Sequence, residues 1–251
     1  MNNQLPDEYD DETPSLFSLL EILGLFALLL MIMTIIALLG MWFLNFLFDF
    51  EAFQILKQNQ NKLFTLCFYM AFCLATLFMV MLVKWRIDTL ESWESVSSYL
   101  GFLEPNWTVL LKWTAVIIGF RLLSWGGELS GDQIGLKDDL FVYGIWLSLL
   151  STVIIAPIFE EIFFRGILWR ATYDKSQSFH VAFWVSGVFF ALAHLNFSPF
   201  ALFHHLLFSY VVTHARLYGG TLAFSIFLHF LHNFLLFLDT LFILSKDLTI
   251  W

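Results

Sequence analysis

Two adjacent glutamates and an arginine lie within one apolar stretch, APIFEEIFFRGILWR, at residues 156–170. An ionisable side chain at membrane depth costs about 2.5–3.5 kcal/mol on insertion scales, so such a residue normally faces protein or water. Glu161 and Arg165 are four residues apart, and they share a helix face on which Arg165 can pair with Glu161 and keep it ionised. Glu160 points about 100° away around the helix. We therefore expect Glu160 to be the carboxylate left for acid–base chemistry.

Histidines gather on the C-terminal side of the glutamates. All seven lie within residues 180–232. His194 follows Phe190 by four residues in FALAH, and His229 precedes Asn233 by four residues in HFLHN, so each pair shares a helix face. An imidazole and an amide that project together into a cavity can donate hydrogen bonds to a developing oxyanion, or can simply hold two helices together. The pattern indicates one polar site among the last helices.

Three further histidines and the two cysteines are interpreted as structural. His204, His205 and His214 have no partner at helical spacing, and we expect them to pack between helices or at the membrane interface. Cys67 and Cys73 fall in one apolar segment, six residues apart. This arrangement argues against a disulfide framework or a thiolate metal site, and we expect two buried free thiols.

The elements that position these residues are membrane helices. The chain has 251 residues, of which 59% are hydrophobic and 13% charged, and its mean hydropathy is +0.78; soluble domains carry about 25% charged residues. The apolar runs are continuous and about 20 residues long, whereas a transmembrane barrel would show short alternating segments. We predict an all-α polytopic transmembrane bundle with about seven helices and a buried polar site between the C-terminal helices. The expected spans are residues 16–48, 63–83, 107–125, 140–170, 179–195, 200–215 and 221–244.

The chain divides into four parts at the sequence level. These are an acidic N-terminal tail (1–14), N-terminal transmembrane helices and loops (15–139), a catalytic core of helices (140–245) and a short C-terminal tail (246–251). The tail has no basic n-region, so we expect no cleaved signal peptide. Pro157 is expected to break the fourth apolar run just before the glutamates, and residues 126–139, rich in Gly and Asp, are expected to form a loop.

The ordered motifs resemble the CPBP family of intramembrane proteases, also called the CAAX prenyl protease or bacteriocin-processing (Abi) family. EEIFFR, FALAH and HFLHN follow one another on three successive helical stretches, and the first 150 residues resemble the family only in being membrane helices. The resemblance implies a glutamate-dependent peptidase in which a carboxylate and a histidine activate water. It assigns Glu160 as general base, His194 as its partner in holding the water, His229 and Asn233 as oxyanion stabilisers, Glu161 and Arg165 as braces, and Phe190 as a packing residue.

The expected function is therefore an intramembrane endopeptidase without a cofactor. Its expected partners are membrane lipid and a peptide or protein substrate with a membrane-proximal cleavage site, and its expected location is a bacterial plasma membrane, which it crosses several times. The 12 Lys and Arg residues are scattered rather than clustered, so nucleic acid is not an expected partner.

Four other interpretations stay open from the sequence. His194, His229, Glu160 and Glu161 could form a zinc site, although there is no HExxH motif. The same residues could relay protons in a transporter, although polar residues in both halves would then be expected. A non-catalytic immunity or scaffold protein could keep the same pocket. The glutamates and arginine could also form only a structural ion pair.

Overall fold

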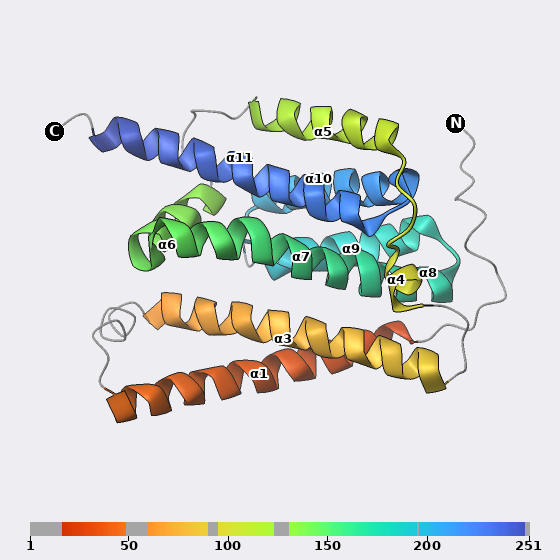
Figure 1. The fold of residues 1–251 in the computed structure, drawn as a ribbon, viewed down its shortest axis with the longest axis horizontal. Helices are drawn as coiled ribbons and strands as arrows, with labels where there is room; N and C mark the ends of the chain where they lie inside the picture. The colour runs from red at the N-terminus through yellow and green to blue at the C-terminus, as the bar shows by residue number, and fades with distance from the viewer. Residues whose placement is uncertain (1–16, 49–59, 90–94, 123–130, 195, 249–251) are drawn as a thin grey trace.

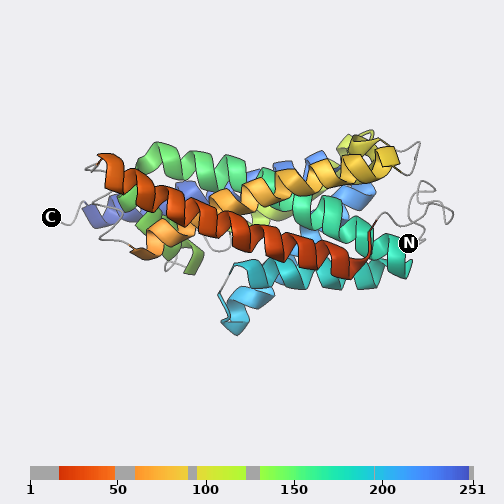
Figure 2. The same ribbon diagram turned by 90° about the horizontal axis from the view of Figure 1, so that it is seen from below.

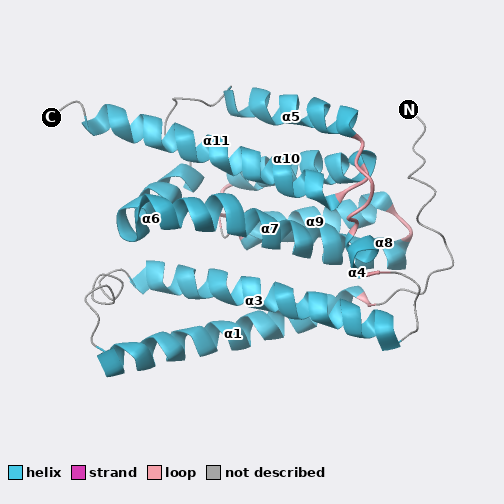
Figure 3. Ribbon diagram, viewed as in Figure 1, coloured by secondary structure: helices cyan, strands magenta, loops and turns pink. Residues whose placement is uncertain are grey.

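The computed structural model describes residues 17–48, 60–89, 95–122, 131–194 and 196–248. Within these ranges the regular secondary structure is entirely helical (Figure 3), apart from an isolated β-bridge between Phe102 and Thr221. The predicted all-α bundle is confirmed. The expected acidic tail at residues 1–14 lies outside the described residues.

The helices follow one another along the chain with short connections, and two segments of π-helix (η) flank the glutamates. In chain order the elements are α1 (Leu19–Phe48), α3 (Gln60–Thr89), α4 (Val96–Leu100), α5 (Trp107–Leu122), α6 (Gly131–Ser148), η1 (Leu149–Ile155), α7 (Ala156–Glu161), η2 (Ile162–Leu168), α8 (Trp169–Ser176), α9 (Phe179–Ala193), α10 (Pro199–Gly219) and α11 (Leu222–Leu248). In Figure 1, α1 and α3 form a hairpin along one side of the molecule, the helical run from α6 to α8 lies beside it, and α11 and α5 follow. Figure 2 shows α1 and α3 crossing the length of the bundle.

Among the described residues, four segments are long and apolar enough to cross a membrane: Leu19–Gly40, Cys67–Thr89, Gly144–Ser176 and Leu222–Lys246. They correspond to the first, second, fourth and seventh expected spans. α9 is a shorter apolar helix, and the other two expected spans form α5 and α10. The chain is an integral, multi-pass membrane protein.

The structure corrects two boundaries. The expected loop at 126–139 is helical from Gly131 onward, because Leu136 packs with Leu236 and Phe237 of α11 and this tertiary contact outweighs the poor helix propensity of Gly and Asp. The break expected at Pro157 is instead at Gly144, whose φ of 77° and ψ of 169° are not helical.

Pro157 is accommodated because it lies in the first turn of α7, directly after η1. The preceding residues Ile155 and Ala156 keep right-handed helical dihedral angles, so the helix continues through the proline. π-Helical turns are rare and often occur at functional sites. Here they lie on both sides of Glu160 and Glu161.

An aromatic cluster joins the α1–α3 hairpin to the helix that follows the glutamates. Phe26 of α1 stacks on Phe163 of η2 with ring centroids 3.6 Å apart, and Phe72 of α3 meets both rings edge-on. Phe164 continues the cluster to Phe190 of α9, with an edge-to-face contact at 5.4 Å. The hairpin is thereby fixed against the motif helices.

The start of α11 is fixed by the segment after α4. The Leu222 N–H donates to the Gly101 carbonyl at 2.6 Å, and Arg216 donates to the Leu100 carbonyl at 3.2 Å. Gly101 has φ +86°, and a Cβ there would lie 2.4 Å from Arg216 Nη2, so this position requires glycine. The Leu222 bond holds the start of α11, which carries His229, and the Arg216 bond holds the end of α10.

Candidate active site

Glu161 is the centre of a fully buried network. Its Oε1 accepts hydrogen bonds from Arg165 Nη1 at 2.9 Å and from His229 Nδ1 at 2.8 Å. The side chains of Glu161 and Arg165 are both 0% exposed. The expected pairing within the helix is confirmed, and the contact with His229 joins α11 to it. A buried charge pair of this kind needs good hydrogen-bond geometry to offset its desolvation.

Glu160 has a different environment, because its side chain borders a pocket and is 13% exposed. In the described part of the chain its Oε2 has no hydrogen-bond partner, and His229 Nε2 lies 3.9 Å from it. Glu161 is therefore held by two donors at Oε1, whereas Glu160 has neither of these bonds and borders a pocket.

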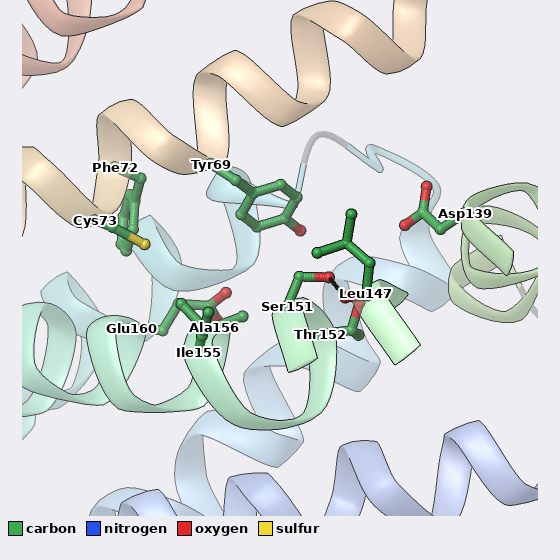
Figure 4. A pocket seen from close by; sticks show the side chains of 10 residues that line it. All are labelled: Tyr69, Phe72, Cys73, Asp139, Leu147, Ser151, Thr152, Ile155, Ala156 and Glu160. Carbon is green, nitrogen blue, oxygen red and sulfur yellow. Dashed lines mark hydrogen bonds between the residues drawn. The ribbon is translucent and has the colours of Figure 1, made fainter. Parts of the chain in front are cut away.

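The pocket beside Glu160 lies between α3 and the turns of η1 and α7 (Figure 4). Its cavity volume is about 60 Å³, which is enough for several water molecules. Its lining is mostly apolar and consists of Tyr69, Phe72, Cys73, Asp139, Leu147, Ser151, Thr152, Ile155, Ala156 and Glu160. Cys67 and Cys73 are free thiols, as predicted, but only Cys67 is buried; Cys73 is partly exposed and lines the pocket.

Phe190 lies between the charged network and the FALAH histidine. The Arg165 guanidinium carbon is 4.1 Å from the centroid of the Phe190 ring, and the His194 ring meets Phe190 edge-on at 4.7 Å. His194 Nδ1 donates to the Phe190 carbonyl oxygen at 2.9 Å. Because a carbonyl only accepts, this bond places the proton of neutral His194 on Nδ1 and leaves Nε2 as the acceptor.

His194 is not in direct contact with Glu160. Among the described residues, its side chain contacts Phe190 and stacks on His205, with ring centroids 3.9 Å apart. The structure thus brings Glu160, Glu161 and His229 together and connects His194 to them through Phe190. The interpretation of His205 as only a packing residue missed its contact with His194, which no spacing along one helix could show.

Asn233 bonds to the backbone of η1. Its Nδ2 donates to the Thr152 carbonyl at 2.9 Å. The Ala156 N–H bonds to the Ser151 carbonyl, so the next acceptor in the π-helical series, Thr152, would pair with Pro157, which has no N–H. Asn233 supplies the missing donor, and the second N–H of its amide is not used by this bond.

We predict that Asn233→Ala lowers the free energy of unfolding by about 1–3 kcal/mol, because it removes the donor to a partly buried carbonyl. In a Pro157→Ala background the backbone N–H returns, and the same substitution should cost at least about 0.5 kcal/mol less. Unfolding of the four proteins in detergent, followed by circular dichroism, measures the difference. An equal loss in both backgrounds would show that Asn233 does not compensate for the proline.

The structure contains a second buried polar cluster that the sequence analysis did not predict. Asp239 of α11 is 0% exposed and accepts from Gln133 Nε2 at 3.0 Å and from Arg121 Nη2 at 3.4 Å. The rule used for the glutamates, that an ionisable residue inside an apolar run calls for a reason, would have identified Arg121 and Asp239. The cluster joins α5, α6 and α11.

The zinc alternative lacks a ligand set in the described ranges, where no three His, Cys, Asp or Glu side chains gather in a way that could hold a metal ion. The absence of a cofactor stays a prediction.

The fold and the site define a membrane-embedded helical protein with a glutamate–histidine centre, and comparison with known proteins shows what this region is similar to. Residues 142–235 match the family model for Rce1-like type II CAAX prenyl endopeptidases. The UPF0177 protein YxdF of Lactococcus lactis subsp. lactis (strain IL1403) is 26% identical over 147 residues, which cover 55% of this chain and 76% of that protein. No solved structure matches the chain.

The match to a CAAX protease family model over the C-terminal helices agrees with the resemblance that the ordered motifs carry. The family supports a CAAX-type intramembrane endopeptidase in general terms, with a peptide substrate in a lipid environment. The bacterial relative supports a bacterial origin.

Proposed function

We propose that the protein hydrolyses a peptide bond at the pocket beside Glu160, with Glu160 as general base. The observation that carries the proposal is the unequal environment of the two carboxylates. Glu161 is held by Arg165 and His229, whereas Glu160 has neither of these hydrogen bonds and borders the cavity. Two carboxylates in unlike environments commonly divide the roles of base and anchor.

In the proposed reaction Glu160 takes a proton from a water molecule while the oxygen of that water bonds to the carbonyl carbon of the substrate. The tetrahedral intermediate then expels the amine, and Glu160 returns the proton to the leaving nitrogen. His194 would hold the water through Nε2, because its Nδ1 is engaged by the Phe190 carbonyl. A bridging water is needed, since His194 and Glu160 do not touch, and catalytic contacts often tighten only when substrate is bound.

The oxyanion would be stabilised by His229 and by the remaining N–H of Asn233. When His229 is protonated, Nδ1 donates to Glu161 and Nε2–H lies on the Glu160 side. Two carboxylates, one guanidinium and one imidazolium then carry no net charge together, which suits a cluster buried among membrane helices.

The proposal is tested with the full chain reconstituted in lipid vesicles and presented with a library of apolar peptides. Wild-type protein should cleave members of the library, and both Glu160→Gln and His194→Ala should abolish cleavage. Chelator should have no effect. Stoichiometric zinc together with activity lost to chelation would contradict the metal-free mechanism, and cleavage that survives Glu160→Gln would contradict the assigned base.

We predict that filling the pocket impairs substrate binding. Cys73→Phe places a bulky ring in the mostly apolar cavity beside Glu160 and should raise KM or abolish cleavage. Leu74→Phe is the matched control, because Leu74 is the next residue of α3, is 48% exposed and does not line the pocket. Steady-state kinetics with one cleaved peptide compares the two. Equal kinetics for both variants would show that substrate does not use this pocket.

A further inference from the structure

α9 and α10 approach each other closely at a point where small residues of the two helices, Gly187 and Ser209, face each other. A Cβ on Gly187 of α9 would lie 3.0 Å from Ser209 Oγ of α10, so glycine permits this spacing. His194 follows Gly187 by seven residues, and His205 precedes Ser209 by four residues, so each histidine lies on the same helix face as the small residue of its own helix. The close contact of the two helices therefore brings the two imidazoles together.

The two rings stack face to face. Their centroids are 3.9 Å apart with an angle of 26° between the planes, and His205 is 4% exposed. His205 is supported on its other sides by Phe190 at 6.2 Å and by His204 at 5.4 Å, both edge-on. The ring beside His194 is thus itself held in place by its neighbours.

Three contacts then define the orientation of His194. Phe190 meets its ring edge-on, the Phe190 carbonyl accepts its Nδ1 proton, and His205 covers its face. A hydrogen bond alone permits rotation of the ring about the axis through Nδ1, whereas a stacked plane restricts that rotation. The remaining polar atom, Nε2, is the one that the proposed reaction uses.

We propose that His205 is a positioning residue for His194, and that its flat ring fixes the imidazole plane in which Nε2 holds the attacking water. This inference rests on the proposed function. It requires the planar face of His205 and does not require an imidazole proton at that position. A ring without nitrogen should therefore serve, and an aliphatic side chain of similar volume should not.

The test compares His205→Phe with His205→Leu in the reconstituted full chain. His205→Phe should keep kcat within about threefold of wild type, whereas His205→Leu should lower kcat at least about tenfold with little change in KM, since a small misplacement of a catalytic group can cost as much as about a hundredfold in rate. His214→Leu is the control on the same helix. His214 packs against Tyr210 at 3.8 Å and outside the proposed site, so its substitution should leave kcat unchanged.

Two results would overturn the inference while leaving the proposed function standing: full activity of His205→Leu, or equal losses in His205→Leu and His205→Phe. Failure of the proposed function is recognised separately, by cleavage that persists in Glu160→Gln or by inactivity of the wild type. In that case nitrogen NMR of histidine-labelled protein still tests the positioning. His194, identified by its loss in His194→Ala, should show one ordered tautomer in wild type and in His205→Phe and a mixture in His205→Leu, and an unchanged spectrum in His205→Leu would overturn the inference.

Discussion

Replacing Glu160 by glutamine should abolish peptide cleavage and leave the helical bundle folded. Glutamine has nearly the same shape as glutamate but cannot accept the proton of the attacking water. Loss of general-base catalysis typically costs about a hundredfold to ten-thousandfold in rate. Because Glu160 borders the pocket and its Oε2 accepts no hydrogen bond in the described structure, the neutral amide breaks no internal hydrogen bond of that oxygen. Peptide cleavage by the reconstituted protein measures the catalytic activity, and unfolding in detergent measures the stability of the same variant.

Glu161→Gln is the matched variant one residue along the same helix. It should also lose activity, but together with stability, because it leaves the Arg165 guanidinium buried beside a neutral amide and weakens the bond to His229. The pair of variants separates a chemical role from a structural one. If Glu160→Gln unfolded as readily as Glu161→Gln, or remained active, the division of roles between the two carboxylates would be wrong.

Arg165→Leu should lower the free energy of unfolding by about 3–5 kcal/mol, because removing one member of a buried ion pair leaves the other charge uncompensated. Arg165 is fully buried, bonds to Glu161 at 2.9 Å and lies over the Phe190 ring at 4.1 Å. The double variant Glu161→Gln, Arg165→Leu should cost less than the sum of the single variants, since no unpaired charge remains. Unfolding in detergent, followed by circular dichroism, gives all three values.

Arg86→Leu is the control for that measurement. Arg86 pairs with Glu21 at 3.3 Å, but the two side chains are 33% and 46% exposed, and an exposed pair contributes about 0–1 kcal/mol. Equal destabilisation by Arg86→Leu and Arg165→Leu would contradict the central place of the Glu161–Arg165 pair in the buried network.

The contacts that the sequence predicted correctly are those within one helix. Glu161 and Arg165 pair as their spacing of four residues indicated, and Phe190 contacts His194 for the same reason. Helical geometry decides such contacts locally, because residues four apart always lie on one face.

Contacts between helices could be identified only from the tertiary structure. Helical spacing shows that His229 and Asn233 share a face, but not what that face meets: His229 bonds to Glu161, while Asn233 bonds to the Thr152 carbonyl. The stacking of His205 on His194 likewise depends on the close approach of α9 and α10 at Gly187.

By itself the sequence determined that the chain is a helical membrane protein, that its ordered motifs resemble one protease family, and that Glu161 takes Arg165 as its partner. Composition, motif order and the helical period carry this information locally. Only the tertiary structure decided that Glu160 borders a pocket, that His229 rather than His194 contacts the glutamates, and that Arg121, Gln133 and Asp239 form a second polar cluster. These features depend on which faces of helices distant in the sequence meet. The packing of whole helices determines those contacts, and the spacing of residues along one helix does not reveal them.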